Sequence, residues 1–353
     1  MAPLLFAGGV RTIAVDRVGF GRTERPSPPT LPPPPALPGR ELLAKSLESL
    51  VDTGGAPAAG LQALIPDPRT ALATALRRPM TLAPRLPWEL SRLGKDPYSA
   101  TFAVRALSPL LKTLIPPNED RCVFFIGHSA GGPLALRALY EAASDRSFLP
   151  ARTQVGGAML VAPAVLDPDE DPDAYDSDNS NSSASEGELP LSVRIAAFRA
   201  ILALPDAFSL GTARRLADRN LTEAVLNQTH ASMAAQPDRV AALVAKYAAP
   251  VDEFPADWDS ALLNVYRADT NSRDDDSILR GRRLLTAARA LNIGTRLAVV
   301  TGDDDRIVPV RASRRVAELL GVEVVEMPET GHLPMDEKPD DMADILLGFL
   351  HPR

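Results

Sequence analysis

Short, mostly apolar runs, rich in β-branched side chains, recur along this 353-residue chain, each followed within three residues by Gly, Asp or Pro. The runs are Thr12–Val15, Val123–Ile126, Ala158–Val161, Leu297–Val300 and Val322–Val325. Continuous rather than alternating apolarity indicates strands buried on both faces, as in a parallel sheet covered by helices. Helical patterns, such as those over residues 133–143 and 310–320, separate several of the runs. The pattern therefore predicts an α/β architecture.

Helical segments follow one another from residue 189 to about residue 291, with no strand signal between them. Residues 238–249 are an example in which apolar positions recur at helical spacing. An all-helical insertion at the ligand-binding edge of a parallel sheet is typical of a lid. Its aromatic residues Phe254, Trp258 and Tyr266 are candidate substrate contacts, with packing inside the lid as the favoured alternative.

Two segments of biased composition interrupt this pattern. The chain has 34 prolines, many of them within residues 26–38, and helical stretches broken by Gly and Pro follow. Residues 167–188 are acidic and rich in Ser and Asn, with too few apolar side chains to order themselves, so we expect a disordered loop. The expected organisation is a core at residues 1–25, 98–166 and 292–353, an insertion at 26–97, the acidic loop at 167–188 and the lid at 189–291.

Composition and charge narrow the partners and the compartment. The formal charge of −7, without a Lys/Arg-rich face, argues against a nucleic-acid binder and favours a small or uncharged partner. The single cysteine, Cys122, cannot form an internal disulfide, which fits a reducing compartment, and its apolar neighbours predict a buried strand position. No apolar run is long enough to span a membrane, and no signal peptide is evident. We expect a soluble, cytoplasmic protein of undetermined oligomeric state, with a plastid as the alternative compartment.

One local motif carries a chemical signal. Gly127, Ser129 and Gly131 form a G-x-S-x-G pattern between an apolar run and a helical pattern that starts near Pro133. A serine on a sharp strand-to-helix turn projects its hydroxyl into a pocket, and flanking glycines allow neighbouring backbone to pass closely. The context therefore predicts a nucleophile elbow rather than an ordinary turn.

A serine nucleophile needs a base and an acid that orients the base. Of the four histidines, His128 adjoins the serine and is expected to support the elbow, His230 lies in the predicted lid and His351 lies near the chain end. His332 remains, on a Gly-containing loop after the last apolar run. For the acid, three adjacent aspartates follow the Leu297–Val300 run, and they cannot all face one imidazole. They are Asp303, Asp304 and Asp305.

The pieces "VDRVGFGRTERP", "GHSAGG", "TGDDDRIVP" and "ETGHLPMDEKP" resemble the successive signatures of the α/β-hydrolase superfamily, in the same order. The resemblance implies Ser129 as nucleophile, Asp305 as acid, His332 as base and the Ala130 backbone N–H as an oxyanion donor. It implies no metal and no organic cofactor. Part of the chain resembles a plant-type branch whose members are mostly uncharacterised, so the resemblance supplies no substrate.

The beginning of the chain departs from this resemblance. Relatives carry a second oxyanion donor on a His-Gly loop after their third strand, and only 15 residues precede Asp16 here. The opening residues match best the end of the first helix running into the fourth strand, so we expect strands one to three to be missing. An alternative is that Pro3–Phe6 replaces the missing strand, with Gly8 and Gly9 as a shortened oxyanion loop.

Two function hypotheses follow. The first is a serine hydrolase that cleaves an ester-like or activated acyl or C–C bond of a small molecule, with an apolar acyl compound as the expected substrate. The second is a catalytically silent protein of the same fold that binds a ligand or partner through the lid pocket. A haloalkane dehalogenase or epoxide hydrolase is disfavoured, because those relatives carry an aspartate at the elbow position that Ser129 occupies here.

Overall fold

The computed structural model describes residues 2–15, 98–165, 222, 225–226, 228–253, 265, 282–290 and 295–351. Four parallel strands form the sheet of this described part, in the spatial order β1-β2-β3-β4. They are β1 (Arg121–His128), β2 (Thr153–Val161), β3 (Arg296–Gly302) and β4 (Val324–Met327). The predicted α/β architecture is confirmed, and each strand overlaps one of the predicted runs. The last strand differs from its prediction in position, since β4 begins two residues after the start of the predicted run.

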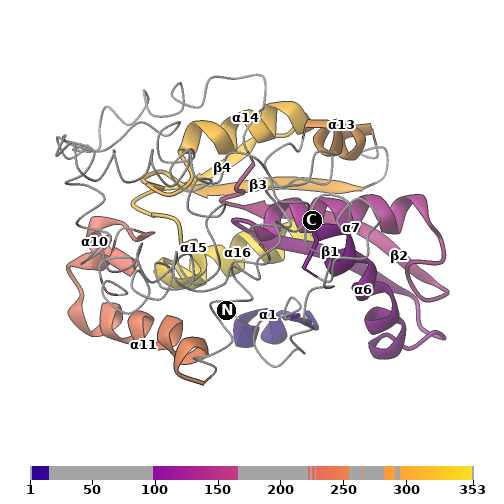
Figure 1. The fold of residues 1–353 in the computed structure, drawn as a ribbon, viewed down its shortest axis with the longest axis horizontal. Helices are drawn as coiled ribbons and strands as arrows, with labels where there is room; N and C mark the ends of the chain where they lie inside the picture. Colours follow the sequence, from indigo (N-terminus) through magenta and orange to yellow (C-terminus); the bar gives the residue numbers. More distant parts are fainter. Residues whose placement is uncertain are drawn as a thin grey trace, which may run out of the picture.

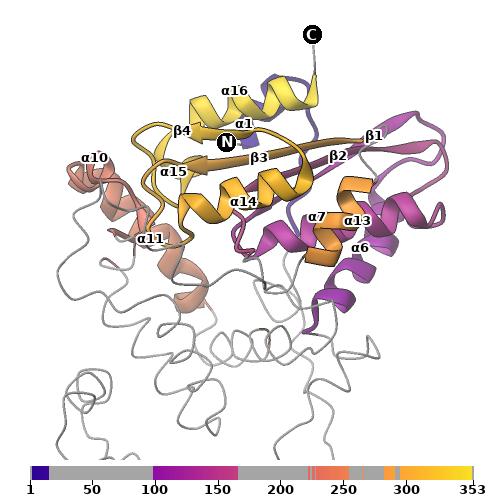
Figure 2. The same ribbon diagram turned by 90° about the horizontal axis from the view of Figure 1, so that it is seen from above.

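Helices cover both faces of the sheet (Figure 2). One face carries α6 (Ala100–Leu114), α7 (Gly131–Ser144), α13 (Arg282–Ala290) and α14 (Val310–Leu320), and the other carries α1 (Ala2–Ala7) and α16 (Pro339–Leu350). Three further helices, α10 (Ala231–Ala234), α11 (Pro237–Glu253) and α15 (Pro334–Glu337), lie together to one side (Figure 1). The described residues thus form a three-layer sandwich, with a helical group beside it.

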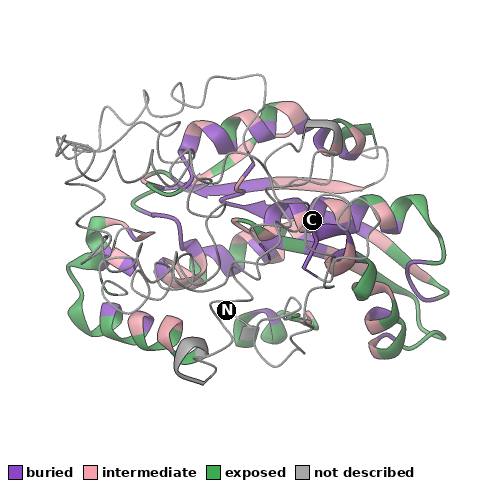
Figure 3. Cartoon of the chain, in the orientation of Figure 1, coloured by how far each residue is buried: buried purple, intermediate pink, exposed green. Residues whose placement is uncertain are grey.

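Successive residues of the central strands enter two different cores. Leu160 of β2 and Val299 of β3 belong to the main core on the α7 and α14 face, whereas their neighbours Met159 and Val300 pack against α16. All four side chains are buried, and the middle of the sheet is coloured purple for buried residues in Figure 3. Burial on both faces explains why the sequence of these strands is apolar without alternation. Each such side chain contributes about 1.5–3 kcal/mol of burial free energy.

The predicted strand at Thr12–Val15 does not form. Residues 11–15 have no regular secondary structure, and no described strand pairs with them. Ile13 packs against the main core while Val15 is 48% exposed, so the apolar run is only partly buried. An apolar run becomes a strand only where a neighbouring strand satisfies its backbone N–H and C=O groups. The alternative of a strand at Pro3–Phe6 is also wrong, because α1 spans these residues.

The prediction that Cys122 is buried is wrong as well. Cys122 is exposed, and Ile126, which points to the same face of β1, is 42% exposed. Within the described sheet β1 is an edge strand, and on this face of it the Phe124 ring meets Phe349 of α16 edge-on. An apolar sequence context therefore did not guarantee burial at this edge.

The expected domain organisation stays a prediction. The insertion at 26–97 and the acidic loop at 167–188 lie outside the described residues, as do Phe254, Trp258 and Tyr266 of the predicted lid. Inside the predicted lid range, α13 packs in the main core through Leu285 and Ala288. None of the described helices combines the length and the apolar character that a membrane crossing requires.

Candidate functional site

The turn that carries Ser129 has the strained geometry of an elbow. Ser129 follows β1 directly and stands two residues before α7, and its backbone φ is +51°, a left-handed value that non-glycine residues rarely adopt. Hydrogen bonds hold it there. Its N–H donates to the Val161 carbonyl at 2.9 Å, and its own carbonyl accepts from Gly132 N and Ala164 N, both at 3.0 Å. Strain of this kind clusters at functional sites.

The two elbow glycines differ in the reason for their presence. A Cβ added at Gly127 would lie 2.1 Å from the Gly131 carbonyl oxygen, so only glycine fits where the strand passes the start of α7. A Cβ added at Gly131 would meet nothing within 4 Å, and this residue has no left-handed φ. The close-approach argument made from the sequence holds for Gly127 and does not hold for Gly131.

The three adjacent aspartates separate into three roles. Asp305 is 1% exposed, and its Oδ1 accepts the backbone N–H groups of Ile307 and Val308, both at 2.9 Å. Asp304 forms an ion pair with Arg306 at 2.8 Å. Asp303 accepts the Thr330 N–H at 3.1 Å, which ties this turn to the loop after β4. Among the three, Asp305 alone reaches the predicted base.

The acid and the base form a buried pair. His332 is 3% exposed, and its Nδ1 lies 2.8 Å from Asp305 Oδ2. An ionised carboxylate only accepts hydrogen bonds, so this contact places the ring proton on Nδ1 and leaves the Nε2 lone pair free to accept a proton. The arrangement matches the requirement for a general base held in one tautomer.

His128 connects the elbow to the loop of the base. Its Nε2 lies 2.8 Å from the His332 carbonyl oxygen, to which it donates, and the centroids of the two rings are 4.8 Å apart. Burial, and after it the neighbouring His332, lowers the pKa of His128, so the ring is neutral at pH 7. The supporting role that the sequence predicts for His128 thus includes a bond across to the base.

The Ser129 hydroxyl and the Ala130 N–H are the remaining parts of the candidate site. Within the described residues, no hydrogen bond joins the Ser129 hydroxyl to His332, and none occupies the Ala130 N–H. Ala130 is exposed and precedes the first residue of α7, where the helix dipole favours negative charge. Catalytic hydrogen bonds are often long until substrate is bound, so the missing serine contact does not disqualify the constellation.

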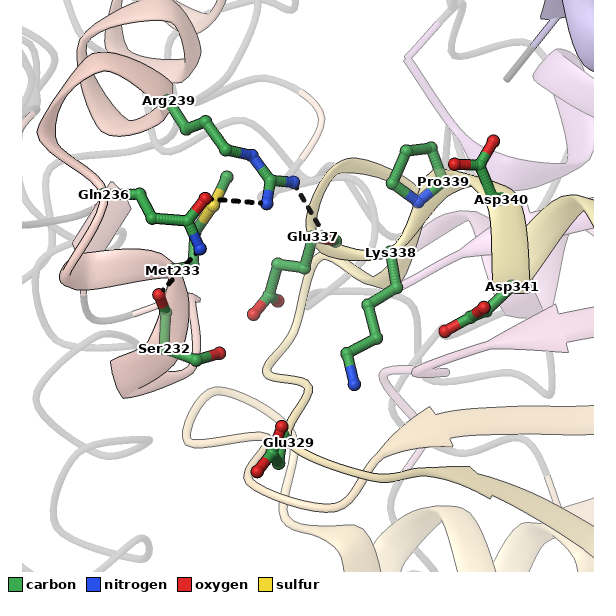
Figure 4. Close-up of a pocket in the computed structure, with 10 residues that line it drawn as sticks. All are labelled: Ser232, Met233, Gln236, Arg239, Glu329, Glu337, Lys338, Pro339, Asp340 and Asp341. Atoms are coloured by element: carbon green, nitrogen blue, oxygen red, sulfur yellow. Dashed lines mark hydrogen bonds between the residues drawn. The ribbon is translucent and has the colours of Figure 1, made fainter.

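A cavity of about 530 Å³ lies beside the base loop, lined by residues of α10, α11, α15 and α16 (Figure 4). None of its lining residues is Ser129, Asp305 or His332, so this cavity is not the pocket into which the elbow would project. Among the described residues, no group of three His, Cys, Asp or Glu side chains is placed to hold a metal ion.

Sequence reasoning missed Glu337. This residue is the last of α15, and its buried carboxylate accepts backbone N–H groups on both sides of His332. It lies in the "ETGHLPMDEKP" segment, five residues after the base, but an acidic residue in an acidic stretch gives no signal of burial. The other histidines lie outside the site: His230 caps α10 by accepting the Ser232 N–H, and His351 is exposed.

Comparison with solved structures gives remote similarities. A serine hydrolase involved in carbazole degradation (CarC enzyme) is 17% identical, with a TM-score of 0.42 and 72% of each chain covered. MGS-M2, an alpha/beta hydrolase enzyme from a Medee basin deep-sea metagenome library, is 15% identical, with a TM-score of 0.43 and the same coverage. A thermophilic esterase from Thermogutta terrifontis is 14% identical, with a TM-score of 0.45, covering 71% of this chain and 72% of its own.

Comparison of the sequence itself decides the family. No curated protein matches it significantly. The model of the alpha/beta hydrolase family matches residues 1–345, which is nearly the whole chain. The chain therefore belongs to the alpha/beta hydrolase family, and its general class of activity is that of a hydrolase.

Proposed function

We propose that this chain is a serine hydrolase that cleaves an ester-like or activated acyl or C–C bond of a small molecule with an apolar acyl group. In this proposal Ser129 Oγ attacks the acyl carbon while His332 Nε2 takes the hydroxyl proton. Asp305 holds the imidazole and stabilises its charged form, and the Ala130 N–H donates to the oxyanion. His332 then returns the proton to the leaving group, and water hydrolyses the acyl-enzyme by the same route.

The buried Asp305–His332 pair is the observation that carries the proposal. Burying a carboxylate is unfavourable unless hydrogen bonds compensate it, and here two backbone N–H groups and the imidazole do so. A fold that needed only stability could place an apolar side chain at this position. The pair lies on the loops after β3 and β4, at the same carboxyl edge of the sheet as the strained serine.

Turnover of short-chain p-nitrophenyl esters tests the proposal. We expect wild-type turnover to fall at least about 10⁴-fold in Ser129→Ala and in His332→Ala, since members of a triad act as a unit. His351→Ala is the matched control, because the exposed His351 follows the last residue of α16, away from the site, and its loss should leave turnover unchanged. Folded wild-type protein without turnover on any acyl chain length would contradict the proposal.

A catalytically silent hydrolase-fold protein that binds a ligand is the second candidate. It is favoured by the absence, within the described residues, of a hydrogen bond between the Ser129 hydroxyl and His332. On this alternative, the elbow and the acid–base pair would be retained only as structure. Turnover that disappears in His332→Ala would exclude it.

A further inference from the structure

The carboxylate of Glu337 lies next to the proposed site but takes no part in the proposed chemistry. Its side chain is 6% exposed and accepts four hydrogen bonds, all from backbone N–H groups. Oε1 accepts from Gly331 N at 3.0 Å and from Leu333 N at 3.1 Å, and Oε2 accepts from His230 N at 2.7 Å and from Gly331 N at 3.1 Å. One buried carboxylate thus binds three separate backbone donors.

Two of these donors flank the base. Gly331 and Leu333 are the residues immediately before and after His332, so Glu337 fixes the backbone on both sides of the imidazole. The backbone of His332 itself is held from other directions, because its N–H donates to Gln228 O at 2.7 Å and its carbonyl accepts from His128. Hydrogen bonds thus fix the residues on either side of His332 as well as its own backbone N–H and carbonyl. The direction of the imidazole is therefore set by these bonds and not by a free loop.

The third donor joins this loop to the helical group beside the sheet. His230 precedes α10, and a Cβ added at Gly331 would lie 2.7 Å from Gln228 O and 2.8 Å from His230 N, so the two backbones are in direct contact. Figure 4 shows Glu337 projecting between α10 and the loop after β4. Arg239 of α11 reinforces this junction by donating to the Glu337 carbonyl at 2.8 Å.

We propose that Glu337 is a positioning residue for His332, holding the loop of the base against the segment at residues 228–230 so that the imidazole keeps its place between Asp305 and Ser129. The inference rests on the proposed function, because only there does His332 act as a base. Misplacing a catalytic group by about 1 Å can cost roughly 100-fold in rate. Loss of this clamp should therefore affect the chemical step and leave substrate binding largely intact.

Glu337→Gln is the test variant, because it keeps the size and shape of the side chain. In either orientation of the amide, its NH₂ group opposes two of the three backbone donors, so the clamp cannot stay intact. Asp336→Asn is the matched control on the same short helix. Asp336 binds Lys246 Nζ at 2.6 Å and the Tyr247 hydroxyl at 3.1 Å, and neither of these hydrogen bonds of its carboxylate involves the base loop.

Steady-state kinetics on p-nitrophenyl esters should separate positioning from general stability. We expect kcat to fall about 10- to 100-fold in Glu337→Gln with KM within about 2-fold of wild type, and both constants to stay within about 2-fold in Asp336→Asn. A kcat unchanged in Glu337→Gln would overturn the proposal. An equal loss in both variants would also overturn it, because a weakened α15 would then explain the result.

A second measurement does not depend on activity. The proton on His332 Nδ1, bonded to Asp305, should give a low-field NMR resonance that shifts or broadens in Glu337→Gln and stays in place in Asp336→Asn. If the wild type shows no turnover, the proposed function fails, and this resonance alone decides the positioning role. An unchanged resonance in Glu337→Gln would overturn it.

Discussion

At Ser129 the chain combines a left-handed backbone with close passage of the preceding strand and the following helix. Both conditions arise from the turn itself, in which β1 ends and α7 begins within three residues. The Ser129 N–H donates to the last residue of β2, and its carbonyl accepts from the loop after β2 and from α7, which keeps the strained conformation in place. The effect of a substitution at this turn on stability should therefore depend strongly on which backbone atoms the new side chain meets.

The two elbow glycines provide a matched pair of substitutions. Gly127→Ala places a Cβ against the Gly131 carbonyl, which is backbone and cannot move aside, so we expect a loss of about 1–3 kcal/mol or more in the free energy of unfolding. Gly131→Ala enters open space and should stay within about 0.5 kcal/mol of wild type. Urea denaturation of both variants checks this, and equal losses would contradict the account of the turn.

His128 should make stability depend on pH. Its pKa in the folded chain is lowered, first by burial and then by His332, below its ordinary value of 6.5. As the pH falls through about 6.5, the unfolded chain gains a proton that the folded chain does not, so the free energy of unfolding decreases. Stability is then greater above this value and is lost progressively below it.

Thermal denaturation at pH 7.5 and pH 5.5 measures this effect. We expect His128→Gln to reduce the drop in Tm between the two pH values, because glutamine keeps a donor for the His332 carbonyl and does not titrate. A drop as large in His128→Gln as in wild type would show that another group is responsible.

At the residue scale, the structure joins two of the predicted residues, Asp305 and His332, by a hydrogen bond, and the groups that hold them were not predicted. Ser129 and His332 follow from local pattern, because the elbow and the loop after the last strand have recognisable sequence contexts. The choice of Asp305 among three aspartates needed the family resemblance. The bond from His128 to His332 spans 204 positions and the clamp of Glu337 depends on backbone donors, and neither leaves a trace in residue spacing.

A helix or strand was predictable from the sequence where its own residues determine whether it forms. The residues expected for the helix at 310–320 coincide with α14, whose apolar face enters the main core. Predictions failed where a neighbouring element decides the outcome: Thr12–Val15 lacks a described partner strand, and Cys122 lies on an edge strand of the described sheet. The residue pattern of a segment indicates its own secondary-structure preference, but it does not indicate which element packs beside it.

Replacing a helix glycine by alanine should change the free energy of unfolding in opposite directions at Gly321 and Gly348. Gly321 ends α14 with φ +73°, and Gly321→Ala should cost about 1 kcal/mol because a Cβ disfavours that conformation. Gly348 lies inside α16 with open space at its Cβ, and Gly348→Ala should gain about 0.5–1 kcal/mol by favouring the helix. The midpoint of urea denaturation measures both. Shifts of the same sign would contradict the assignment.

Across the whole molecule, the candidate site assembles from three loops at the carboxyl ends of parallel strands. Backbone bonds link these ends in succession. Ser129 N donates to Val161 O at 2.9 Å, Ala162 N donates to Val300 O at 2.8 Å, and Asp303 N donates to Met327 O at 3.0 Å. The sheet therefore sets the relative positions of the elbow, the acid and the base. The roles of Ser129, Asp305 and His332, the expected missing strands and the lid all remain predictions.

The central claim is that these parts form one reactive serine, and covalent labelling by a fluorophosphonate probe tests it most directly. The proposal predicts that folded wild-type protein gains one adduct on the peptide containing Ser129. The adduct should be absent in Ser129→Ala and should form at least about 100-fold more slowly in His332→Ala. Folded wild type that stays unlabelled, or a Ser129→Ala variant that labels as fast as wild type, would contradict the claim.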